Sequence, residues 1–135
     1  MEVKDKDLTD SMRLPGLCNI CRKPCKMRCG HHVRTVGECR IDHPWNLVQL
    51  GMNPRDCLCH HNFHATGKPT RHDFLCAVSK REGVPLEFIV DVMNAVIACP
   101  PRMLSHEAAT AWLVKAFPAD VALKAAEIVK PMFKE

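Results

Sequence analysis

Cysteine and histidine are concentrated in one segment of this 135-residue chain. Seven of its nine cysteines and six of its eight histidines lie between Cys18 and His64. The odd number of cysteines, and residues 1–13 without an apolar run, argue against the disulfide framework of an exported protein. Thiols and imidazoles gathered this densely are typical of metal coordination in a reducing compartment. The sequence therefore predicts a metal-binding protein of the cytoplasm.

The composition permits one compact domain, or a very small domain with an appendage. Hydrophobic residues make up 47% and charged residues 25% of the chain, as in ordinary globular proteins. The formal net charge of +4 fits a polyanionic partner but does not require one. The longest uncharged apolar stretch, residues 92–101, is far shorter than the roughly 20 residues of a membrane-spanning helix. We therefore expect no membrane partner.

The chain changes character near residue 80, which predicts three regions. Residues 1–15 alternate acidic and basic groups and are expected to form a charged, flexible tail. Residues 16–81 would form a loop-rich unit with short strands that is organised by metal, and residues 82–135 a helical region. The expected fold class is therefore α+β.

Local signals predict where helices begin and end in the second half of the chain. Thr70 and Asp73 have the spacing of a helix start, and Gly83 would end that helix. A second helix is expected over about 85–99, because apolar residues recur there at helical spacing and two prolines follow. A third would follow an N-cap at Ser105, and a fourth would run from near Pro118 to Val129.

Two cysteine pairs are the candidate ligands of a structural zinc ion. Cys18-Asn-Ile-Cys21 places two thiolates one ligand spacing apart, and Cys57-Leu-Cys59 would complete four sulfur ligands. The second pair is unusual, because only one residue separates its cysteines. Three other cysteines therefore remain as competing ligands, or as buried small residues or spare thiols: Cys25, Cys29 and Cys39.

Histidines supply a second candidate set. His60 and His64 are four residues apart, so on a helix they would project from one face and bind the same cation. His31 would add a third ligand from a preceding strand. Because adjacent strand residues point to opposite sides, His32 would stay unligated and available as a general base. His61 would replace His60 if the register slipped by one residue.

The order of these motifs resembles the HNH endonucleases. The likeness rests on His31-His32, then Asn46, then His60-x-x-x-His64, with Cys-x-x-Cys upstream and cysteines just before the last histidine pair. It is closest to the small phage and bacterial members in which a zinc knuckle braces a ββα-metal site. The resemblance covers about residues 17–80. It implies a small zinc-braced, treble-clef-like ββα-metal core, followed by the helical C-terminal region.

The resemblance also implies a function. The protein would be a metal-dependent endonuclease that hydrolyses phosphodiester bonds in DNA, in the host cytoplasm if a phage encodes it. His31, His60 and His64 would hold one catalytic divalent ion. The candidates for this ion are Mg²⁺, Mn²⁺, Ni²⁺ and Zn²⁺. His32 would activate the attacking water, and Asn46 would fix the orientation of that base.

Two further assignments depend on the same resemblance. Arg34, Arg40 and Arg55 would contact DNA phosphates. Residues 51–56 form an insertion relative to the family, so Asn53 competes with Asn46 as the motif asparagine.

Other functions are compatible with the sequence. The main alternative is a non-catalytic, zinc-stabilised nucleic-acid-binding or regulatory protein, in which every cysteine and histidine ligand serves structure. An enzyme with a Cys-His nucleophile would need a free thiolate beside a histidine, whereas these cysteines come in ligand-like clusters. The sequence does not indicate an oligomeric state, and a homodimer is compatible with it.

Overall fold

The computed structural model describes residues 1–34 and 40–133. Within this part the predicted α+β class is confirmed, with two two-stranded sheets and six α-helices. The described residues divide into two compact units. We call residues 5–34 and 42–84 the cysteine–histidine unit, and residues 1–4, 40–41 and 85–133 the helical unit.

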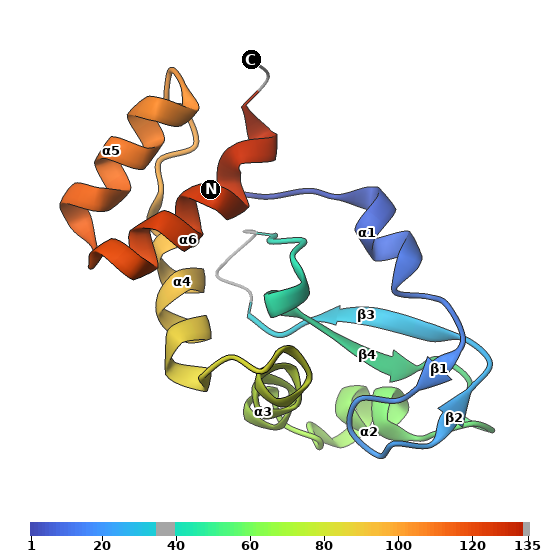
Figure 1. The fold of residues 1–135 in the computed structure, drawn as a ribbon. Helices are drawn as coiled ribbons and strands as arrows, with labels where there is room; N and C mark the ends of the chain where they lie inside the picture. Colours follow the sequence, from blue (N-terminus) through green and yellow to red (C-terminus); the bar gives the residue numbers. More distant parts are fainter. Residues whose placement is uncertain (35–39, 134–135) are drawn as a thin grey trace. The chain divides into compact units, whose positions relative to one another are not determined.

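The cysteine–histidine unit contains all four strands. After helix α1 (Lys6–Ser11), strand β1 (Gly16–Leu17) pairs antiparallel with β2 (Pro24–Cys25). Strand β3 (Arg28–His32) pairs antiparallel with β4 (Leu47–Gly51), which follows the short 3₁₀ helix η1 (Pro44–Asn46). Helices α2 (Cys59–Thr66) and α3 (Arg71–Glu82) both contact β4 (Figure 1).

Strand β4 carries the core of this unit. Its Leu47, Val48 and Leu50 are fully buried, as are Phe74 and Val78 of α3, and burial of each such side chain contributes about 1.5–3 kcal/mol. The register of the sheet sets His31 opposite Val48 and His32 opposite Leu47. The two adjacent histidines are therefore held on a strand whose partner is anchored in the core.

Part of the expected N-terminal tail is a helix. Asp5 lies just before α1, and its carboxylate accepts a hydrogen bond from the backbone N–H of Leu8 at 3.0 Å. The side chain of Asp7 adds negative charge to the first turn, where the helix dipole favours it. Residues 6–11 of the expected tail are therefore helical, because a local side-chain cap begins a helix in a segment that lacks an apolar stripe.

The capping signals around α3 are confirmed. The hydroxyl of Thr70 accepts from the backbone N–H of Asp73 at 3.1 Å, and the carboxylate of Asp73 accepts from the N–H of Thr70 at 2.8 Å. Gly83 ends the helix with a φ of 66°, a left-handed conformation that favours glycine.

The helical unit consists of α4 (Leu86–Ala98), α5 (His106–Ala116), α6 (Ala119–Val129) and the 3₁₀ helix η2 (Lys130–Met132). The bounds of the three α-helices agree with the predicted ones to within one or two residues. The predicted cap at Ser105 is confirmed, because its hydroxyl accepts from the N–H of Ala108 at 3.0 Å. Helix α6 contacts both α4 and α5. Their shared core is made by apolar side chains that include Ile89, Val92, Met93, Leu113, Ala122 and Val129.

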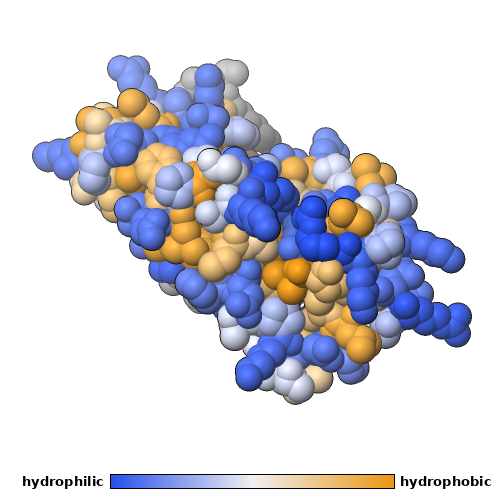
Figure 2. Space-filling model, turned by 60° about the horizontal axis from the view of Figure 1, so that its bottom comes forward, coloured by the Kyte–Doolittle hydropathy of each residue, from blue (hydrophilic) through white to orange (hydrophobic). Residues whose placement is uncertain are grey.

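The surface is mixed in character. On the face drawn in Figure 2, hydrophilic side chains separate several smaller hydrophobic areas. Exposed apolar residues include Met27 and Leu58 in the cysteine–histidine unit, and Leu104 and Leu123 in the helical unit. Within residues 1–34 and 40–133, none of the helices has the length and apolar character needed to cross a membrane.

Removal of the α3 cap should destabilise the protein measurably. We expect Thr70→Ala to lower the free energy of unfolding by about 1 kcal/mol, because the backbone N–H of Asp73 loses its acceptor, whereas the N–H of residue 70 keeps the Asp73 carboxylate. Thr70→Ser keeps the hydroxyl and should stay near the wild-type value. Urea unfolding followed by circular dichroism measures both, and equal stability of Thr70→Ala and wild type would contradict the role of the cap.

Candidate functional site

The two predicted cysteine pairs come together. The sulfur atoms of Cys18, Cys21, Cys57 and Cys59 all lie within 4.8 Å of one another. Four sulfurs around a zinc ion, each about 2.3 Å from the metal, are separated by about 3.8 Å in a tetrahedron. Small side-chain movements therefore suffice to bind a metal ion. Only one residue separates Cys57 from Cys59, but this spacing does not keep their sulfurs apart from the first pair. Cys57 lies before α2, whereas Cys59 is the first residue of that helix.

Cys25 and Cys29, two of the competing cysteines, are not members of this four-sulfur group. Cys25 is buried, and its thiol donates a weak hydrogen bond to the carbonyl of Lys23 at 3.4 Å. Burial, together with the nearby sulfurs of Cys57 and Cys18, raises the pKa of Cys25 to about 11. Cys29 lies within β3, where burial also raises its pKa. Cys39 lies outside the described residues.

The charges within the four-sulfur group favour a bound cation. Burial opposes ionisation of Cys18, but hydrogen bonds from the backbone of Cys21, Ile20 and Gly51 outweigh it and lower its pKa to about 7. Burial and the neighbouring sulfurs raise the pKa of Cys21 and that of Cys59. Several thiolates this close repel one another, and a divalent ion removes that repulsion. Four sulfur donors at such a spacing are typical of structural zinc sites in proteins.

The first cysteine pair is tied to the sheet through the residue between its ligands. The backbone N–H of Asn19 donates to the carbonyl of Gln49 at 2.8 Å, and the N–H of Gln49 donates to the Asn19 side chain at 2.7 Å. Arg81 of α3 donates to the same side-chain oxygen at 2.9 Å. The four-sulfur group is therefore attached to both β4 and α3.

A glycine makes room for the sulfurs at the end of β4. A Cβ atom placed on Gly51 would lie 2.6 Å from the sulfur of Cys25 and 3.1 Å from that of Cys57. Real Cβ atoms do not approach sulfur so closely, so any other residue at this position would displace the cysteines.

The three predicted histidine ligands also converge. One ring nitrogen each of His31, His60 and His64 lies within 4.8 Å of the others. His60 and His64, one turn apart on α2, approach to 3.0 Å between their Nε2 atoms, and the ring of His31 from β3 lies 5.4 Å from that of His64. The neighbouring His61 is exposed and lies outside this histidine group. Imidazole nitrogens in this arrangement are suited to hold one divalent ion.

Several contacts prepare His31 as a ligand. Its Nδ1 faces the backbone carbonyl of His32 at 3.3 Å, and since a carbonyl only accepts, Nδ1 donates and Nε2 keeps its lone pair. The ring also rests against Phe63 and Phe74, with centroids 4.9 and 5.7 Å away. Burial, followed by the positive charges of His60, His64 and Arg71, lowers the pKa of His31. Burial and His64 likewise lower the pKa of His60.

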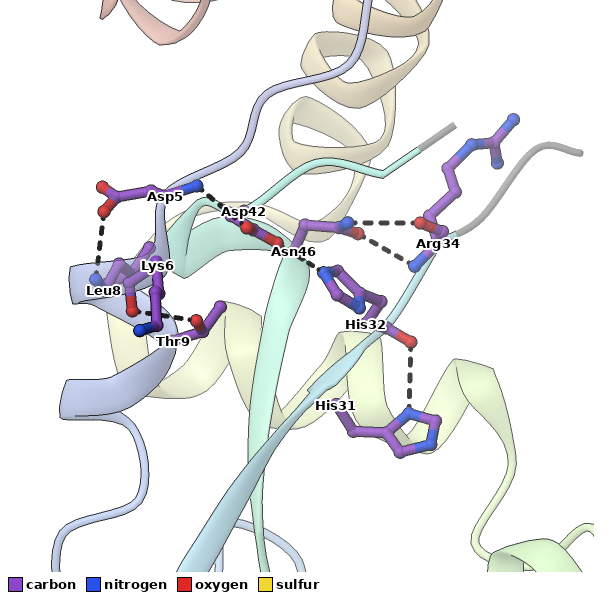
Figure 3. A network of polar contacts seen from close by, with 9 residues as sticks. All are labelled: Asp5, Lys6, Leu8, Thr9, His31, His32, Arg34, Asp42 and Asn46. Atoms are coloured by element: carbon purple, nitrogen blue, oxygen red, sulfur yellow. Dashed lines mark hydrogen bonds and ion pairs between the residues drawn. The ribbon is translucent and has the colours of Figure 1, made fainter. Parts of the chain in front are cut away.

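His32 occupies a different environment from its neighbour. Figure 3 shows His31 and His32 leaving β3 in opposite directions, as their positions on a strand require. The Nε2 atom of His32 lies 2.7 Å from Oδ1 of Asp42, whose side chain is 0% exposed. The other oxygen of Asp42 accepts from the backbone N–H of Asp5 at 2.9 Å. Sequence reasoning missed Asp42, because no motif or helical spacing links it to His32.

Asn46 is fully buried and extends the pairing of β3 with β4. Its side-chain oxygen accepts from the N–H of Arg34 at 2.8 Å, and its amide nitrogen donates to the carbonyl of Arg34 at 3.2 Å. These bonds hold the backbone two residues beyond His32. Asn53, the alternative, is exposed in the turn after β4, where its side chain accepts from the N–H of Arg55 at 3.0 Å.

The arginines predicted to contact DNA have different positions. Arg34 is exposed, and its guanidinium extends away from His31 in Figure 3. Arg55 is exposed in the turn between β4 and α2, and Arg40 is exposed in the helical unit. Sequence reasoning missed Arg71, which donates from Nη1 to the carbonyls of His32 and Val33 at 3.2 and 3.0 Å. The sequence indicated only that Arg71 directly follows Thr70, the N-cap of α3.

Comparison with known proteins identifies no relative. The chain matches none of the protein-family models, curated proteins or solved structures with which it was compared. An assignment of function therefore depends on the two clusters and on the contacts of His32.

The four-sulfur group should bind zinc through Cys21. We expect Cys21→Ala to lose tightly bound zinc after dialysis, because three sulfurs leave one position of the tetrahedron open to water and chelators. Cys76→Ala changes another exposed cysteine that lies outside the group and should retain the metal. Elemental analysis of the purified proteins measures both. Equal zinc content in the two variants would contradict the assignment.

The histidine group should bind a second divalent ion in a pH-dependent way. We expect His60→Ala to abolish this binding and His61→Ala to preserve it, as measured by calorimetric titration of zinc-loaded protein with Mn²⁺ or Ni²⁺. Because the pKa values of His31 and His60 lie below the ordinary 6.5, both rings are neutral at pH 7 and free to bind metal. Protons compete only at lower pH, so affinity should be level from pH 7 to 8 and fall below about pH 6. Tighter binding on acidification would contradict this arrangement.

Proposed function

We propose that the protein is a metal-dependent endonuclease of the HNH type that hydrolyses phosphodiester bonds in DNA. One observation carries the proposal: three imidazoles converge from β3 and α2, while the adjacent fourth, His32, stays outside the group. A purely structural metal site gives no reason for such a fourth histidine. In this proposal β3, β4 and α2 form the ββα-metal core, and the four-sulfur group holds a structural zinc ion in a treble-clef-like arrangement.

The residues of the histidine group fit a catalytic divalent ion. Three neutral nitrogen ligands leave positions open for a phosphate oxygen and water, as in catalytic rather than structural metal sites. When bound, the ion supplies Lewis-acid stabilisation of the phosphate and of the departing 3′ oxygen. His31, His60 and His64 would hold it, and Mg²⁺, Mn²⁺, Ni²⁺ and Zn²⁺ are all candidates.

His32 would act as the general base. One of its ring nitrogens is hydrogen-bonded to Asp42, so the other is the one that takes a proton from the attacking water. Asn46 would support this role from the backbone, since its two bonds to Arg34 hold the segment that follows His32. We prefer Asn46 to Asn53 as the motif asparagine, because Asn46 is buried beside the histidine strand.

DNA is the proposed substrate because the chain carries a formal charge of +4 and arginines near the histidine strand. Arg71 is the best placed of these, since its backbone bonds use Nη1 and leave other N–H groups for a phosphate. The phosphate contacts expected of Arg34, Arg40 and Arg55 remain predictions.

A plasmid-nicking assay tests the proposal. Wild-type protein should convert supercoiled DNA to nicked or linear forms when a divalent ion is added, and EDTA should stop the reaction. His32→Ala should reduce the rate by about 10²–10⁴-fold, the usual contribution of a positioned base. His61→Ala removes an exposed neighbouring imidazole and should keep wild-type activity.

Metal analysis and DNA binding complete this test. His32→Ala should keep the zinc content and the DNA affinity of the wild type, because it removes a base and no ligand. If the wild type bound DNA in a salt-dependent manner but cut it with none of the four ions, the result would overturn the nuclease proposal and favour the non-catalytic zinc protein.

A further inference from the structure

We infer that Asp42 is a positioning residue that sets the tautomer and the ring orientation of His32. The inference rests on the proposed function, because it assigns Asp42 a role toward the general base. None of the sequence motifs pointed to Asp42, and the family resemblance assigned the orientation of the base to Asn46.

The burial of Asp42 indicates that its carboxylate serves a specific partner. Its side chain is 0% exposed, and burying an ionised carboxylate costs much free energy unless it is well hydrogen-bonded. One oxygen lies 2.7 Å from Nε2 of His32 and the other 2.9 Å from the backbone nitrogen of Asp5. Asp5 is itself held as the N-cap of α1. The carboxylate is therefore fixed from two sides, and its Oδ1 points at the imidazole (Figure 3).

This contact determines which nitrogen of His32 is free to take a proton. An ionised carboxylate only accepts hydrogen bonds, so Nε2 must carry the hydrogen that lies between them. The lone pair of the neutral ring is then on Nδ1, and Nδ1 is the atom that would accept the proton of water. The short bond also restrains rotation of the ring. The side chain of His32 is 26% exposed, so solvent still reaches part of it.

Asp42 and Asn46 thus have separate tasks. Asn46 bonds the backbone of Arg34 and holds the chain beyond His32. Asp42 bonds the imidazole itself. Loss of Asn46 would move the whole segment, whereas loss of the Asp42 charge would change the ring alone.

The substitution Asp42→Asn separates positioning from a purely structural role. The backbone N–H of Asp5 needs an acceptor, so the amide oxygen of asparagine should face Asp5 and its NH₂ group should face His32. A donor at Nε2 favours the tautomer with the hydrogen on Nδ1. The variant keeps the shape of the side chain but reverses the tautomer, which leaves no lone pair toward the water.

Nitrogen-15 NMR of the metal-loaded full chain at pH 7.5 tests this directly. We expect long-range ¹H–¹⁵N correlations to give the Nε2–H tautomer for His32 in the wild type and the Nδ1–H tautomer in Asp42→Asn. In the nicking assay the variant should lose about 10²–10⁴-fold in kcat, with KM, zinc content and the unfolding transition unchanged. Asp73→Asn is the matched control, because Asp73 also accepts a backbone N–H but lies at the start of α3. It should change neither the tautomer of His32 nor kcat.

Two results would overturn the inference. The first is an Nδ1–H tautomer of His32 in the wild-type protein. This measurement requires no variant, so it remains decisive even if Asp42→Asn fails to fold. The second is an unchanged kcat in a folded Asp42→Asn variant of an active enzyme. Absence of cleavage by the wild type would instead overturn the proposed function, and the NMR result would still decide whether Asp42 sets the tautomer.

Discussion

The position of α2 is the constraint on which the candidate site depends. This helix has eight residues, and none of its side chains is fully buried, so neither its length nor its packing can hold it firmly. Cys59 at its start and Cys57 just before it lie beside Cys18 and Cys21 of the loop between β1 and β2, and this loop is bonded to β4 through Asn19. A metal ion bound by these four sulfurs would fix the start of α2. Because His60 and His64 belong to the same helix, it would also fix the geometry of the histidine group.

In the proposed function, strand β3 would separate two chemical tasks between neighbouring residues of one type. His31 lies among His60, His64 and two phenylalanines, where burial and positive charge keep the ring neutral and ready to bind a cation. His32 leaves the other side of the strand and lies against a carboxylate. Imidazole is equally capable of ligation and of proton transfer, so the surroundings would decide which of the two each ring performs.

The features predictable from sequence are those that local spacing determines. The Thr70 and Ser105 caps, the end at Gly83 and the shared face of His60 and His64 all follow from helix geometry within a few residues. The contact of Asp42 with His32 joins residues ten positions apart in the sequence, a separation that no helical or strand periodicity predicts. Helix α1 escaped prediction because its stability comes from one side-chain cap and not from an apolar stripe.

Gly51 has a consequence for the histidines at the opposite end of the sheet. If β4 slid by one residue, the side chain of Leu50 or Met52 would have to enter the space between the sulfurs of Cys25 and Cys57, where not even a methyl group fits. The same slide would exchange the two faces of β4 and set His31 and His32 opposite other residues of that strand. The tight space at Gly51 thus restricts the strand pairing to one register, four residue pairs away from His32.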